Sequence, residues 1–167
     1  MKVAAFFLLL FFAMKTRSAE PELREVKSLF EAAVHSKDSA DRLLKILYSV
    51  GQSSSPLLIC YKGAAEMIRC RYGFNPIHKF SRFKKGRILI EEAVKKEPDN
   101  LEIRFVRFAI QTNIPAFLNY NDHITNDKKY LLSNVKKIKD KKLKQDILAY
   151  LSTSNYCTAA EKKGLSI

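Results

Sequence analysis

Three polar side chains in the middle of the chain have the spacing that a binding site on one helix face requires. Arg104, Arg107 and Gln111 are separated by three and four positions, so a helix would place them in one row. Arginine suits anion recognition because its planar guanidinium donates two parallel hydrogen bonds to one carboxylate. We therefore expect a polar groove that could grip an acidic group, such as a peptide carboxylate.

A second polar row is predicted earlier in the chain, where Lys62, Glu66 and Arg69 show similar spacing. In a stack of helical hairpins the two rows could face one another. The expected contact surface then consists of Tyr61, Lys62, Glu66, Arg104, Arg107 and Gln111. The alternative is an internal network in which Glu66 or Glu91 pairs with the arginines and holds the helices in register. Pairing is expected in both cases, because a buried arginine without a partner is costly.

Local signatures of catalysis and metal binding are missing. No G-x-S-x-G or S-x-x-K motif occurs, and no cysteine lies near a histidine in sequence. His35, His78 and His123 are isolated from one another and from the cysteines, which disfavours a metal site. We expect neither cofactor nor catalysis, although an acid–base pair assembled by the fold would leave little local trace.

Apolar residues recur at helical spacing, and no segment alternates with a period of two. This pattern predicts an all-α fold of about seven or eight helices without a sheet, built as antiparallel hairpins in a right-handed array. The first helix begins near Pro21, Phe117 to Tyr120 form a single turn, and Thr158 opens a last short helix through a capping box with Glu161. The other expected helices cover 40–50, 56–72, 78–96, 101–111, 124–138 and 140–151.

Small residues mark possible helix contacts on the third and fourth predicted helices. Gly63, Ala64 and Ala65 lie in the middle of the third helix and Gly86 lies in the fourth, and small residues at these positions would let another helix approach closely. On the fourth helix an inward-facing row is expected, consisting of Phe80, Phe83, Ile90 and Val94.

The beginning of the chain has the layout of a secretory signal peptide. Lys2 precedes an apolar run from Val3 to Ala13, which is too short to span a membrane, and small residues follow. We predict a signal peptide at 1–18 and a single domain at 19–167, secreted or periplasmic. Lys15 and Arg17 are unusual near a cleavage site, so cleavage after Ser18, cleavage after Ala19 and retention of the leader all stay open.

The predicted domain is strongly basic, with 27 basic and 17 acidic residues once Lys2, Lys15 and Arg17 are set aside. Outside the cytoplasm the available polyanions are lipid head groups, glycans and acidic proteins rather than nucleic acid. Six lysines lie between Lys136 and Lys144 and could rest on an anionic surface. The alternative for this run is a solvated face, because it lacks bulky apolar residues for insertion and Asp140 interrupts it.

The three cysteines leave the disulfide pattern open. Ten residues separate Cys60 from Cys70, or about 15 Å along one helix, so these two cannot pair within it. Cys157 could pair with either after folding. Alternatively, Cys60 and Cys70 are small buried apolar residues.

The segment 61–98 resembles a tetratricopeptide repeat. Tyr61 and Ala65 have the spacing of the first repeat helix, and Ala93 and Pro98 fit the end of the second. A longer insert, Gly73 to Arg82, is expected between them. Such folds are mostly binding scaffolds, so the resemblance implies a protein or peptide partner.

A second resemblance covers more of the chain. The segments YKGAAEM (61–67), FNP (74–76), EIRFVRFAIQ (102–111) and IPAFLNY (114–120) are similar to an uncharacterised family of secreted helical proteins of Gram-negative bacteria. The resemblance implies a helical fold in the bacterial cell envelope. It supplies no catalytic residue.

Overall fold

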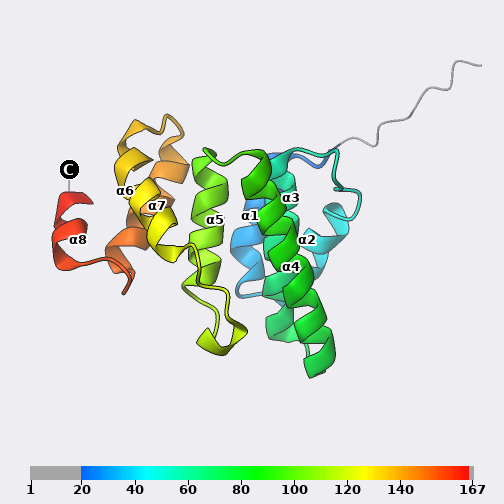
Figure 1. Cartoon of the computed structure of the whole chain (residues 1–167). Helices are drawn as coiled ribbons and strands as arrows, with labels where there is room; N and C mark the ends of the chain where they lie inside the picture. The colour runs from blue at the N-terminus through cyan, green and yellow to red at the C-terminus, as the bar shows by residue number, and fades with distance from the viewer. Residues whose placement is uncertain (1–19, 166–167) are drawn as a thin grey trace, which may run out of the picture.

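The computed structural model describes residues 20–165, which form an all-α fold with no strand among them (Figure 1). This confirms the predicted fold class. The predicted signal peptide at 1–18 lies outside the described residues. The α-helices are α1 (Leu23–Ala33), α2 (Lys37–Ile46), α3 (Pro56–Arg69), α4 (Pro76–Lys96), α5 (Leu101–Gln111), α6 (Ile124–Asn134), α7 (Lys141–Thr153) and α8 (Ala159–Leu165). Short 3₁₀ turns are η1 (Cys70–Tyr72), η2 (Ala116–Leu118) and η3 (Val135–Lys137).

Side-chain caps set the first residue of most helices. The Ser55 hydroxyl accepts a hydrogen bond from the Leu58 amide, directly before Pro56, as the sequence predicts. The predicted capping box of α8 is also present: Thr158 accepts from the Glu161 amide at 3.2 Å, and Glu161 accepts from the Thr158 amide at 2.7 Å.

Two helix starts differ from the prediction, and caps explain both. Ser36 accepts from the Ser39 amide, so α2 begins at Lys37 rather than at Ala40. Asn75 accepts from the amides of Ile77 and His78, so α4 begins at Pro76. The predicted insert from Gly73 to Arg82 is therefore wrong, because most of it is the first two turns of α4.

The hydrophobic core consists of two clusters that meet at α5. One cluster joins α1 to α4 and includes Ile103 and Val106 of α5. The other joins α6 to α8 and includes Phe108 of α5. Figure 1 shows α5 standing between the two groups of helices. Because α5 serves both clusters, its remaining polar positions must also find partners inside the protein.

The most extensive helix pair is α3 with α4, and it depends on two glycines. A Cβ atom at Gly63 would lie 2.7 Å from the backbone oxygen of Gly86, and one at Gly86 would lie 2.6 Å from that of Gly63. The predicted close approach is confirmed. Of the predicted inward row on α4, Phe83, Ile90 and Val94 are buried, whereas Phe80 is 50% exposed and is a correction.

Among the described residues, no helix has both the length and the apolar character needed to cross a membrane.

Candidate functional site

Arg107 of α5 lies at the centre of the most deeply buried polar cluster. Its guanidinium donates to both carboxylate oxygens of Asp127 on α6, from Nε at 2.7 Å and from Nη2 at 2.8 Å. Its Nη1 donates to Glu91 of α4 at 2.7 Å. Arg107 is 3% exposed and Asp127 is fully buried, so these contacts are largely shielded from water.

Arg104 extends the cluster by one turn of α5. Its Nη1 donates to Asp127 at 2.8 Å, and its Nε donates to the Pro98 carbonyl at 2.7 Å. Its guanidinium also lies over the ring of Tyr130, 4.7 Å from the ring centre. Two arginines therefore share one buried carboxylate, and three helices are joined through charged side chains.

Glu91 forms the edge of the cluster that reaches solvent. Its second carboxylate oxygen accepts from the Tyr120 hydroxyl at 2.6 Å, and the Nε2 of His123 lies 3.6 Å from the first. Burial and the bond to Glu91 raise the pKa of Tyr120, so this phenol stays protonated. Burial alone would lower the pKa of Arg107, but its bonds to Asp127 outweigh that effect and raise the pKa.

A second cluster surrounds Glu102 of α5. The Tyr61 hydroxyl donates to Glu102 at 2.6 Å, and the Lys27 ammonium lies 2.8 Å from the same carboxylate. Burial and the neighbouring Glu102 raise the pKa of Tyr61, which is 5% exposed. Tyr61 thus links α3 to α5 inside the protein.

Glu66 and Lys62 of α3 point in different directions. Glu66 is buried and accepts from Arg82 at 2.5 Å and from Lys85 at 2.6 Å, both on α4. Lys62 donates to the backbone carbonyls of Tyr48 and Val50 after α2. Desolvation and the nearby Lys85 lower the pKa of Lys62.

The six predicted contact residues are therefore divided among separate clusters. Four of them are buried, namely Tyr61, Glu66, Arg107 and Gln111. Of the internal pairs that the sequence allowed, Glu91 with Arg107 is present, whereas Glu66 contacts α4 instead of the arginines. Gln111 is 2% exposed, and its amide atoms have no hydrogen-bond partner among the described residues.

Asp127 is the buried carboxylate at the centre of the cluster, and sequence reasoning missed it. Its neighbours Asn126, Lys128 and Lys129 are polar, which is typical of an exposed stretch. The available signal was its spacing of three from Ile124 and four from Leu131, which places it on the buried face of α6.

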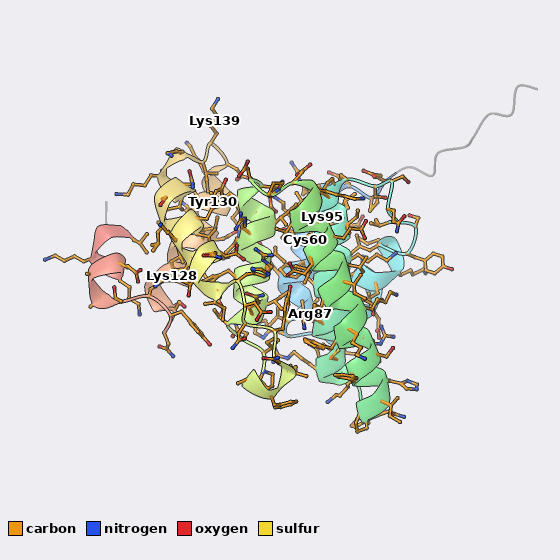
Figure 2. The ribbon with its side chains drawn as sticks, in the orientation of Figure 1. Cys60, Arg87, Lys95, Lys128, Tyr130 and Lys139 are labelled. Atoms are coloured by element: carbon orange, nitrogen blue, oxygen red, sulfur yellow. The ribbon has the colours of Figure 1, made fainter. Side chains whose placement is uncertain are left out.

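An open hollow of about 370 Å³ lies beside the central cluster. Arg104 and Lys129 supply cationic groups at its wall, and Tyr130 supplies an aromatic ring, which Figure 2 labels on α6. The rest of the lining is polar: Asn126, Ser133 and Asn134. Within residues 20–165 no group of three or more histidine, cysteine or acidic side chains is arranged to hold a metal ion.

The stretch 67–90, which we call the α4 basic segment, carries the highest concentration of positive charge on the hairpin of α3 and α4. It contains no acidic residue and seven basic ones: Arg69, Arg71, Lys79, Arg82, Lys84, Lys85 and Arg87. Four of these pair with three acids, Asp41, Glu66 and Asp122, which leaves four positive charges in excess. Within the described part of the chain, Arg71, Lys79 and Lys84 have no acidic partner.

The lysines of the C-terminal run lie elsewhere. Figure 2 shows Lys139 at the end of the molecule opposite the first turn of α4. Lys142 pairs with Glu31 and with Asp146, so part of the charge in this run is neutralised. Its pKa is raised by the bonds to those two carboxylates.

Comparison of the chain with protein-family models, with curated proteins and with solved structures gives no match.

Proposed function

We propose that this protein is a helical binding module outside the cytoplasm that attaches to an anionic macromolecular surface through the α4 basic segment. The observation that carries the proposal is the excess of four positive charges in the α4 basic segment. The acids and arginines that could serve catalysis instead bind one another. The signal-peptide pattern supports export, and a tetratricopeptide-like stacking of hairpins would suit a rigid scaffold.

The experiment measures the salt concentration at which two variants elute from a column of heparin, which serves as the polyanion. Each variant carries three substitutions and loses three positive charges. One variant carries Arg71→Gln, Lys79→Gln and Lys84→Gln in the α4 basic segment. The matched control carries Lys136→Gln, Lys137→Gln and Lys139→Gln, which are exposed lysines at the opposite end. We expect the first variant to elute at clearly lower salt than the control, because clustered charges bind a polyanion together. Equal shifts for both variants would mean that net charge alone retains the protein, and the assigned surface would be wrong.

A second candidate function, recognition of a peptide carboxylate, is favoured by the hollow beside Arg104. Lys129 and Arg104 present two cationic groups there next to an aromatic ring. The test is binding of a peptide library with free C-termini, against the same library with amidated C-termini. Selective capture of free C-termini that Lys129→Gln abolishes would support this function, and equal capture of both libraries would reject it.

A further inference from the structure

We infer that the anionic surface is a lipid bilayer and that exposed apolar side chains beside the α4 basic segment insert among its head groups. This inference rests on the proposed function and adds the identity of the partner. The side chains concerned, which we call the apolar tip, are Phe74, Ile77, Phe80 and Phe117.

The apolar tip is unusual in its exposure. Phe74 is 100% exposed, Ile77 is 77% exposed and Phe117 is 84% exposed. A single exposed apolar side chain needs no explanation, but several gathered at one end of a protein indicate a contact surface. Figure 1 shows the first turn of α4 and the turn η2 extending to the same end of the molecule.

Internal contacts join the two parts of the tip. Phe80 stacks on Phe83 with ring centres 6.5 Å apart, and Phe83 meets Tyr120, just after η2, at 6.2 Å. Arg87 donates to the Asn119 carbonyl at 3.4 Å and lies over the Tyr120 ring. The loop that carries Phe117 is therefore held against α4 at Phe83 and Arg87.

Positive charge surrounds the apolar tip. Lys79 and Lys84 lie on the same two turns of α4 as Phe80, and the Lys84 ammonium lies 4.7 Å from the centre of the Phe80 ring. Arg71 lies in η1, three residues before Phe74. Apolar residues that enter the acyl boundary and basic residues that stay at the head groups are the two components of interfacial membrane binding.

The exposure of these side chains favours a bilayer over an acidic protein or a glycan. Each side chain of the apolar tip is at least half exposed, so a protein partner would need a matching pocket for each one. A bilayer accepts projecting apolar groups without a preformed pocket. The C-terminal lysine run has the charge but lacks such residues: its apolar members Ile138 and Leu143 are partly buried against the second core cluster.

The test uses the absence of tryptophan from this chain. Phe74→Trp places a single fluorophore in the apolar tip of the full-length protein. Tyr48→Trp is the matched control, because Tyr48 is 86% exposed but follows α2. Vesicles of phosphatidylglycerol and phosphatidylethanolamine, with and without bromine-labelled acyl chains, are then added to each variant. Since each fluorophore reports its own position, binding through the leader would not imitate insertion of the tip.

We expect the emission of Phe74→Trp to shift to shorter wavelength and to be quenched by the labelled chains, while Tyr48→Trp changes little. Adding Lys79→Gln and Lys84→Gln should weaken the vesicle affinity about 25-fold, at roughly fivefold for each charge near the lipid. Phosphatidylcholine vesicles should give a much weaker shift.

Three outcomes would overturn the lipid assignment. The first is no shift of the tryptophan emission at position 74, and the second is an equal emission shift at positions 48 and 74. The third is an emission shift at position 74 that grows with protein concentration in the absence of vesicles, which would indicate contact with a second copy of the chain. If vesicles cause no emission shift at position 74 but the two triple variants elute from heparin at different salt concentrations as expected, the proposed function stands and only the lipid assignment is wrong.

Discussion

The guanidinium of Arg107 binds both carboxylate oxygens of Asp127, at 2.7 and 2.8 Å, in the buried space between α5 and α6. Glu91 contacts the same guanidinium from α4 at 2.7 Å. The arrangement joins the helices of the first core cluster to those of the second. We therefore expect substitutions in this cluster to change the stability of the protein and not its binding of a ligand.

Removing the charge of Asp127 should destabilise the protein strongly. Asp127→Asn leaves two arginines around a neutral amide, and we expect a loss of about 3–5 kcal/mol in the free energy of unfolding. Urea unfolding at neutral pH measures this loss. The matched control is Asp122→Asn, whose carboxylate is largely exposed 3.5 Å from Arg87 and should contribute at most about 1 kcal/mol. Equal effects of the two substitutions would show that the buried network does not hold the helices together.

A methyl group at the crossing of α3 and α4 should also destabilise the fold. Gly86→Ala would place a Cβ 2.6 Å from a backbone oxygen, so the two helices must move apart. We expect a net loss of about 1–3 kcal/mol despite the better helix propensity of alanine. Gly164→Ala in α8 is the control, since nothing lies within 4 Å of its added Cβ, and it should be neutral or slightly stabilising. Thermal unfolding of both variants is the measurement, and an unchanged melting temperature for Gly86→Ala would contradict the close approach.

Gln111 should be replaceable by an apolar side chain of similar size. Its amide is buried without a hydrogen-bond partner among the described residues, a situation that costs about 1–3 kcal/mol. We therefore expect Gln111→Met to raise the free energy of unfolding, as measured in urea. A clear loss of stability would instead mean that the amide makes contacts of its own, for example with a buried water. If the Gln111→Met variant still binds the protein's partner, then Gln111 is not part of the contact surface.

The three cysteines should behave as thiols. None forms a disulfide in this fold: Cys60 lies in the first core cluster and Cys157 in the second. Burial raises the pKa of all three thiols, and it does so most strongly for Cys60, which is fully buried. A thiol-specific reagent should react slowly with the native protein, first at the half-buried Cys70, and with all three cysteines in urea without reductant. Only one reactive thiol in urea would show that Cys157 pairs with Cys60 or Cys70.

Local rules predicted most helix boundaries, and their failures have a local cause. Ser55 before Pro56 and Thr158 with Glu161 gave correct starts, because a cap needs only neighbours in the chain. Asn75 and Pro76 lie in the insert expected between two helices, although these two residues cap and begin α4. Phe80 is expected inside because its spacing matches Phe83, but it packs only on Phe83 and Lys84 and stays half exposed.

The sequence by itself determined the helical class, the positions Gly63 and Gly86 at which a helix can approach closely, and the excess of positive charge. Each of these depends on periodicity, residue size or composition, which act over a few neighbouring residues or over the whole chain. Only the tertiary structure decided the partners of Arg107. They are Glu91, sixteen positions before it, and Asp127, twenty positions after it. Spacing shows which face of a helix a side chain occupies, whereas the packing of other helices decides what lies opposite. For the same reason only the fold could reveal that Phe74, Ile77 and Phe117 are exposed to solvent.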